Sequence, residues 1–312
     1  MKMMIMTKSK KTMAGLLVLI LGTMLLLSAC GGGANKESSA DGAGEITVGS
    51  KNFTENMLLA LMMAELIEAK TDIKVKRQVN LGGSNVAWSA LKNDEIQLYP
   101  EYTGTIVANY YQEETGNSAE SLAKTRELLT EDELVFMEPF GINNTYTLAV
   151  TRETAEQHNL KTFSDLAKVS EDMILGVEFE FLDRDDGFPG IQKLYGMNFK
   201  QQKGMDHGIM YQSIANGETD VTNAYATDAQ IKVHDLVILQ DDKEFFPPYD
   251  AGPIIRQATL EKYPELEEVL NQMSGLISDE EMQKLNADVD VEGLKEEEVA
   301  RQFLIEKGLI EG

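Results

Sequence analysis

Apolar and polar positions follow two periods along the chain, one typical of helices and one typical of strands. In residues 54–69 apolar side chains recur at helical spacing, whereas residues 73–79 alternate between apolar and charged. The alternation predicts a strand with one exposed face. In chain order we expect strand 45–50, helix 54–69, strand 73–79, helix 84–91 (opened by Gly82-Gly83, with Ser84 or Asn85 as N-cap) and strand 96–99, ended by Pro100.

A second series of strands and helices follows, and the chain then turns helical. Strands and helices that alternate in this way predict mainly parallel sheets with helices on both faces, here in two lobes. Ligands of such sheets bind beyond the carboxyl ends of the strands, so we expect a site in a cleft between the lobes. The second series comprises strands 146–151, 173–177, 220–224 and 236–239, helices 163–169 and 207–216, and tail helices 259–273, 278–285 and 291–306.

The first 44 residues have a different character. Four lysines, the last of them Lys11, precede a short apolar run over residues 14–27, which ends at Leu27-Ser28-Ala29-Cys30. This order is typical of a signal peptide, here residues 1–29, and the run is too short for a membrane span. The ending resembles a bacterial lipobox, which implies a lipid on Cys30. Residues 30–44 lack large apolar side chains and predict a flexible tether. The alternatives are an uncleaved anchor helix, or a secreted protein with one stray thiol.

Charge and motif content exclude several functions. The formal net charge of −24 argues against partners such as nucleic acid. The histidines His158, His207 and His234 have no ligand-like spacing, and we expect no metal and no cofactor. The run from Asp183 to Gly187 resembles a calcium loop, but the glutamate that such a loop needs is missing. Phosphate-loop, nucleophile-elbow and dinucleotide motifs are absent from the sequence, so we do not expect an enzyme.

Several of the ten tyrosines stand in polar, turn-like contexts at strand ends, where a cleft would be lined. Tyrosine faces attract cations by up to about 2 kcal/mol when the site is desolvated. A quaternary ammonium cannot donate a strong hydrogen bond, so an aromatic box suits it. Any one of these tyrosines alone would be interpreted as a core residue. Four together indicate a cation site: Tyr102, Tyr146, Tyr225 and Tyr249.

A zwitterionic ligand would also need partners for its carboxylate. Lys51, Thr105 and Arg184 lie in polar turns beside predicted strands, which makes them candidates. An arginine can hold a carboxylate through two parallel hydrogen bonds.

Four motifs resemble the substrate-binding lipoproteins of osmoprotectant ABC importers, which bind glycine betaine, carnitine or choline. The resemblance extends from Glu45 to the C-terminus. It implies a type II periplasmic-binding fold that closes around a compatible solute and delivers it to a membrane permease. The motifs are Ser50-Lys-Asn-Phe-Thr-Glu55, Leu98-Tyr-Pro-Glu-Tyr-Thr-Gly-Thr105, Leu182-Asp-Arg-Asp-Asp-Gly187 and Phe245-Phe-Pro-Pro-Tyr249.

The resemblance also assigns roles to single residues. The four tyrosines would form the box, and Thr105 would contact the carboxylate or hydroxyl end of the ligand. Lys51 and Arg184 match basic positions that hold the carboxylate in some members. Asn56 stands where many relatives carry glutamine, and its shorter side chain would alter a polar contact to the ligand.

The chain order predicts how the lobes are assembled. Residues 45–145 and 244–312 would form lobe 1, and residues 146–243 would form an inserted lobe 2, with the hinge strands crossing near residues 146 and 243. We expect a monomer, tethered by its lipid on the extracytoplasmic face of the membrane.

Three other interpretations remain open at this point. The ligand could be another betaine, such as ergothioneine. The protein could be an extracytoplasmic hydrolase that uses Asp183, Asp185 and Asp186, or a purely structural surface lipoprotein.

Overall fold

The computed structural model describes residues 44–312. The predicted signal peptide, Cys30 and the tether up to residue 43 therefore lie outside the described residues. Within residues 44–312, no helix combines the length and the apolar character that crossing a bilayer requires.

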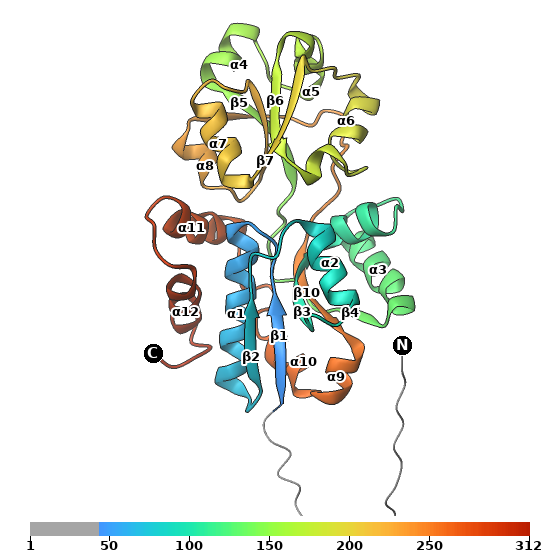
Figure 1. Ribbon diagram of the computed structural model, residues 1–312, viewed down its shortest axis with the longest axis vertical. Helices are drawn as coiled ribbons and strands as arrows, with labels where there is room; N and C mark the ends of the chain where they lie inside the picture. The colour runs from blue at the N-terminus through green and yellow to red at the C-terminus, as the bar shows by residue number, and fades with distance from the viewer. Residues whose placement is uncertain (1–43) are drawn as a thin grey trace, which may run out of the picture. The chain divides into compact units, whose positions relative to one another are not determined.

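Ten strands form two five-stranded sheets, each with helices packed around it (Figure 1). We call the first sheet with its helices lobe 1 and the second lobe 2. This arrangement confirms the predicted two-lobed α/β fold. The first sheet has the order β2-β1-β3-β10-β4 (β1 Glu45–Gly49, β2 Lys74–Gln78, β3 Leu98–Tyr102, β4 Leu134–Phe136, β10 Ala251–Arg256). The second has the order β7-β6-β8-β5-β9 (β5 Tyr146–Thr151, β6 Ile174–Glu178, β7 Gln201–Met205, β8 Val221–Tyr225, β9 Leu236–Leu239).

One strand in each sheet runs against its neighbours. β10 pairs antiparallel with β3 and β4, and β5 pairs antiparallel with β8 and β9, whereas β1 and β6 pair in parallel on both sides. β5 and β10 are the first strands after the chain crosses between lobes. The parallel strands end at the cleft, so a strand that enters from the cleft must run the other way. The sheets are therefore more mixed than the sequence predicted.

The helices agree with the prediction in several places and differ in others. α1 begins at Thr54, as predicted, and ends at Lys70. The predicted helix 259–273 is two helices, because Pro264 falls between them. Lobe 1 contains α1 Thr54–Lys70, α2 Ser84–Lys92, the π-helix η1 Thr105–Tyr110, α3 Ser118–Leu129, η2 Thr130–Asp132, α9 Gln257–Lys262, α10 Glu265–Asn271, α11 Asp279–Asp290 and α12 Glu296–Glu306. Lobe 2 contains α4 Arg152–His158, α5 Phe163–Ala167, η3 Ser170–Asp172, η4 Glu180–Leu182, α6 Phe188–Tyr195, α7 His207–Ala215 and α8 Gln230–Val233.

Two predictions about local structure were wrong. Pro100 does not end the strand before it but lies inside β3, which continues to Tyr102. Ser84 and Asn85 do not cap α2, because Gly83 holds the N-cap position and Ser84 is the first helical residue. The Ser84 hydroxyl is instead engaged by residues of lobe 2, as described below.

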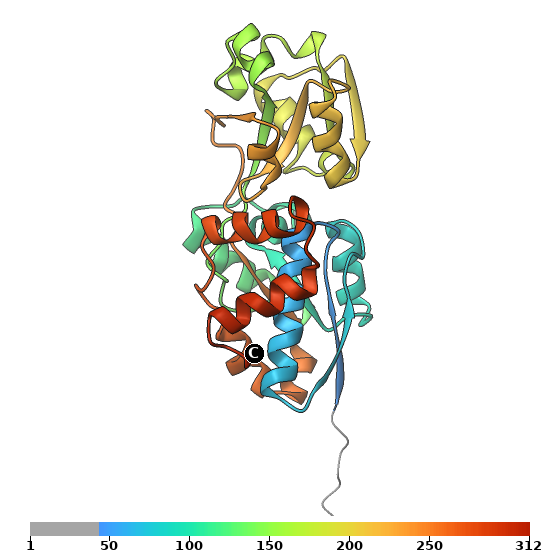
Figure 2. The ribbon, with the colours of Figure 1, turned by 90° about the vertical axis from the view of Figure 1, so that its left-hand side faces the viewer.

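The core lies on both faces of the first sheet. Neighbouring strand residues point to opposite faces, so Leu98 and Ile255 pack with the buried side of α1, whereas Tyr99 and Ile254 pack with α2. Helices α11 and α12 lie beside α1 and cover its outer side (Figure 2). These contacts fix the ends of β1 and β3 and the start of α1 at one edge of the sheet.

Two segments connect the lobes, one before β5 and one before β10 (Figure 1). They run side by side, since Asn143 and Asp250 form an antiparallel bridge and the Asn144 N–H donates to the Tyr249 carbonyl at 3.1 Å. The lobe boundaries given above, near residues 146 and 243, stay a prediction.

Candidate functional site

A small, nearly closed cavity between the lobes has a volume of about 20 Å³, which is room for about one water molecule. All four predicted tyrosines line it, together with the three predicted carboxylate partners. The full lining is Lys51, Phe53, Ser84, Tyr102, Thr105, Asn144, Tyr146, Glu180, Arg184, Tyr225 and Tyr249. Of the predicted site residues in the described chain, only Asn56 lies outside this lining.

The tyrosines come from strand ends that face the cleft. Tyr102 is the last residue of β3 and Tyr225 the last residue of β8, so both lie at carboxyl ends. Tyr146 is the first residue of β5, and Tyr249 lies two residues before β10. Because the crossing strands run antiparallel to their neighbours, their amino ends meet the carboxyl ends of the other strands at the cavity.

The rings form a continuous aromatic wall. The Tyr146 ring centroid lies 4.9 Å from that of Tyr225 and 5.4 Å from that of Tyr249, which it meets edge-on. Phe53, which the sequence analysis did not single out, lies 5.1 Å from Tyr225 and 6.2 Å from Tyr102. Such a wall brings several aromatic rings to one small volume.

Three of the four phenol groups are fixed by buried carboxylates. Tyr102 donates to Glu55 at 2.7 Å, Tyr225 to Glu178 at 2.5 Å and Tyr249 to Asp186 at 2.7 Å. The pKa of each of these three phenols is raised well above its ordinary value. Burial is the larger cause, and the nearby carboxylate is the second. The phenols therefore stay neutral donors. Each of these three rings is therefore held in one orientation.

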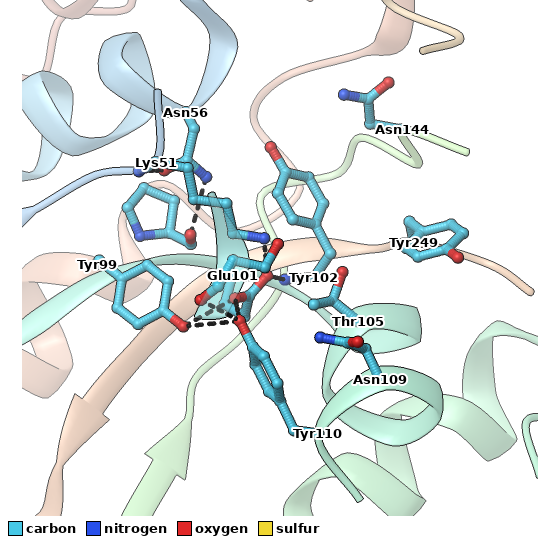
Figure 3. A network of polar contacts seen from close by, with 12 residues as sticks. Lys51, Asn56, Tyr99, Glu101, Tyr102, Thr105, Asn109, Tyr110, Asn144 and Tyr249 are labelled. Atoms are coloured by element: carbon cyan, nitrogen blue, oxygen red, sulfur yellow. Dashed lines mark hydrogen bonds and ion pairs between the residues drawn. The ribbon is translucent and has the colours of Figure 1, made fainter. Parts of the chain in front are cut away.

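Lys51 belongs to a buried charge network below the cavity (Figure 3). Its ammonium donates to Glu101 at 2.5 Å, and the side chains are 3% and 0% exposed. Tyr99 and Tyr110 each donate to the other oxygen of Glu101 at 2.7 Å. The Lys51 ammonium also lies 4.9 Å from the centroid of the Tyr102 ring. The charge of Lys51 is thus already balanced by Glu101.

Arg184 reaches across the cleft to lobe 1. It forms two parallel hydrogen bonds to Asp186, of 2.8 and 2.6 Å. It also donates to the hydroxyls of Ser84 at 3.0 Å and Thr105 at 3.2 Å. Its guanidinium carbon lies 5.5 Å from the Tyr146 ring centroid. Arg184 therefore joins both lobes at the polar end of the cavity and stacks against its aromatic wall.

Asn56 supports the site from behind. Its side-chain oxygen accepts the Lys51 N–H at 2.7 Å, and its amide donates to the Pro100 carbonyl at 2.9 Å. Both partners are backbone groups, and Asn56 is fully buried (Figure 3). The structure places it where it orients Lys51, and a direct contact to a ligand stays a prediction.

Sequence reasoning missed several lining residues. Glu180 follows β6 and accepts from the Ser84 N–H at 2.6 Å and the Ser84 hydroxyl at 3.0 Å. Its position after a predicted strand was the available signal, as it was for the tyrosines. Asn144 lies in the same Asn-Asn-Thr-Tyr segment as Tyr146, and its amide donates to Glu55 at 2.8 Å.

The acidic run from Asp183 to Asp186 does not form a metal site or a free catalytic group. Asp186 is bound by Arg184 and Tyr249 and is 4% exposed. Across residues 44–312, the His, Cys, Asp and Glu side chains form no group of three or more that could hold a metal ion. Asp186 therefore serves to position Arg184.

Residues 44–306 match the sequence family described as the substrate binding domain of ABC-type glycine betaine transport systems. The carnitine transport binding protein OpuCC of Listeria monocytogenes (strain 10403S) is 34% identical over 311 residues, which cover 97% of this chain and 99% of that protein. The ergothioneine transport permease/ergothioneine binding protein EgtU of Helicobacter pylori (strain G27) is 36% identical over 265 residues, 85% of this chain and 48% of that protein.

A solved structure described as a glycine betaine/carnitine/choline ABC transporter is also similar. It matches with a TM-score of 0.67 and 33% sequence identity, over 85% of this chain and 99% of that one. Proteins of this family bind substrates for transport and are not enzymes, so the hydrolase interpretation is set aside. The chain belongs to the substrate-binding domains of ABC-type glycine betaine transport systems.

Proposed function

We propose that the cavity binds a small quaternary-ammonium solute, with its trimethylammonium group enclosed by Tyr102, Tyr146, Tyr225 and Tyr249. The observation that carries this proposal is the convergence of four buried tyrosines, from both lobes, on one small cavity. The carboxylates of Glu178 and Asp186, which accept hydrogen bonds from Tyr225 and Tyr249, add negative charge behind those two rings, which favours a cation further.

The other end of the cavity suits a carboxylate or a hydroxyl group. Arg184, Thr105 and Ser84 place a guanidinium and two hydroxyls there, already linked by hydrogen bonds. A ligand carboxylate would exchange one of these internal bonds for its own. Lys51 is a weaker candidate for this role, because Glu101 already holds its ammonium.

The solute would be released to the permease of an ABC importer on the extracytoplasmic face of the membrane. Contacts across the cleft support capture by closure, since Ser84 and Thr105 of lobe 1 bond Glu180 and Arg184 of lobe 2. A ligand that touches both lobes favours the closed state by its differential affinity for that state.

Calorimetric titration of residues 30–312 with glycine betaine, carnitine and choline tests the proposal. We expect saturable heat with at least one of them, at a stoichiometry of one. Glycine should give no heat, because its ammonium group carries no methyl groups for the rings to contact. Absence of binding by all three trimethylammonium compounds would refute the proposal.

Ergothioneine is a second candidate ligand, and one observation favours it. Glu180 lines the cavity with a carboxylate that could accept an N–H donor of the imidazole ring. The similarity to EgtU is consistent with this. Displacement of bound carnitine by ergothioneine would identify a shared site, and the lower dissociation constant would name the preferred ligand.

We further propose that the mature protein is a monomer, anchored by a lipid on Cys30. The lipobox-like ending and the small, polar residues 31–44 support this proposal. The Cys30→Ser protein should appear in the soluble extracytoplasmic fraction instead of the membrane fraction when cells are fractionated. Retention of the variant with the membrane would contradict a lipid anchor at this cysteine.

A further inference from the structure

Glu55 is a buried carboxyl group that touches both lobes. It lies in the first turn of α1 and is 2% exposed. One of its oxygens accepts from Tyr102 at 2.7 Å and from Asn144 at 2.8 Å. The other accepts from the hydroxyl of Thr227, which follows β8 in lobe 2, at 2.6 Å. Glu55 therefore links a cavity tyrosine, a segment that connects the lobes, and lobe 2 itself.

The described partners of Glu55 are all neutral donors. A buried carboxylate without a cation is costly, and the cost falls when the group is protonated. The proton has a place here, because the oxygen beside Thr227 could donate to that hydroxyl while the other oxygen keeps both of its donors. Burial raises the pKa of Glu55 to about 7, although these hydrogen bonds lower it in part.

The charges around Glu55 add to this effect. Asp228, next to Thr227, raises the pKa of Glu55 further by repulsion. Burial disfavours the charged form of His207. The carboxylates of Asp228 and Glu178 favour it more strongly, so the pKa of His207 lies well above its ordinary value. The charged groups on the elements around Glu55 are Asp228 and Glu178 with His207 between them, Glu101 with Lys51, and Asp290, which accepts from the Thr54 hydroxyl.

We propose that Glu55 is a positioning residue that takes up a proton as the lobes close over ligand, which ties capture of the solute to the protonation of this buried carboxyl. Opening of the cleft would separate Thr227 from Glu55 and admit water, which favours the ionised form. The closed state binds the proton more tightly than the open state, so acid favours closure. This inference rests on the proposed function.

The sign and size of the effect follow from linkage. The pKa of Glu55 is about 7 in this closed structure, and the proposal gives it the ordinary value of 4.5 in the open state. Affinity is then gained as the pH falls below about 7. We expect binding to be about tenfold tighter at pH 6 than at pH 8, with uptake of roughly half a proton at pH 7.

Titration of the mature protein with choline and glycine betaine at pH 6, 7 and 8 tests this proposal. Neither compound titrates in this range, and two buffers with different ionisation enthalpies report the proton uptake directly. Glu55→Gln should bind with an affinity that does not change with pH and that matches wild type at pH 6. The amide keeps the size of the side chain and supplies the hydrogen atom that the protonated acid would give to Thr227.

Asp290→Asn is the matched control, because Asp290 is another acid near α1 whose pKa burial raises. It should keep the pH dependence of wild type. Three results would each overturn the proposal: a wild-type affinity that does not change with pH, a Glu55→Gln affinity that changes with pH as in wild type, or an Asp290→Asn affinity that does not change with pH. Thermal unfolding of the Gln variant separates a loss of fold from a change in binding. Absence of heat at every pH would instead refute the proposed function.

Discussion

Tyr146→Ala should weaken the binding of a trimethylammonium ligand by at least tenfold. Tyr146 stands at the centre of the aromatic wall, with ring contacts to Tyr225, Tyr249, Phe181 and Phe246. A desolvated cation–π contact is worth about 2 kcal/mol, which corresponds to roughly a 30-fold change in the dissociation constant. Loss of the ring also frees its neighbours to turn away from the ligand.

Tyr146→Phe is the matched control for this prediction. It keeps the ring and removes a hydroxyl whose described contact is a long one, 3.5 Å from the Tyr225 hydroxyl. We expect an affinity within about threefold of wild type, since a neutral hydrogen bond this long should contribute only the low end of the usual range, about 0.5 kcal/mol. Calorimetric titration measures the affinity of both variants, and thermal unfolding verifies that each of them is folded. Equal affinity of the Ala and Phe variants would place the cation elsewhere.

The contrast between Tyr146 and Asn56 illustrates what the sequence could predict. The tyrosines could be predicted as site residues because they lie in turn-like segments at strand ends. The fold brings these ends together at the cleft regardless of how the side chains pack. Asn56 directly follows the first motif, yet its side chain turns to the backbone of Lys51 and Pro100. The direction of a side chain on a helix depends on which neighbours are already packed, and one sequence does not reveal that.

Contacts between distant residues account for most of what was missed. Ser84 was expected to cap α2, but its hydroxyl and N–H meet Glu180, ninety-six positions away in the chain. Lys51 was expected to be free for a ligand, but Glu101 on β3 holds it. The polar turn at Lys51 was predicted to be part of the site, whereas Ser84 was expected only as a helix cap. The partner that takes up the polar group lies on another element, beyond the range of local patterns.

Arg184→Ala should lower the free energy of unfolding by about 3–5 kcal/mol, because it leaves the carboxylate of Asp186 buried without its cation. The two side chains are 2% and 3% exposed, and their bond has two parallel N–H···O contacts. The Tyr249 hydroxyl would remain as a donor to Asp186, but a neutral phenol does not balance a buried charge. Ligand binding should also weaken, since Thr105 loses its link to lobe 2 and Ser84 is left with Glu180 alone.

Arg152→Ala supplies the control for this effect. Arg152 pairs with Asp235 in the same way, but the side chains are 56% and 67% exposed, so water screens the pair. Its loss should change the free energy of unfolding far less than the loss of Arg184 does. Urea unfolding of both variants without ligand compares the two pairs. Arg184→Met with Asp186→Leu should recover much of the loss, because the buried charge of Asp186 is removed together with that of Arg184. If Arg184→Ala cost no more than Arg152→Ala, the Arg184–Asp186 pair would be hydrated in the ligand-free protein. The closed cleft would then be a state that the ligand must induce.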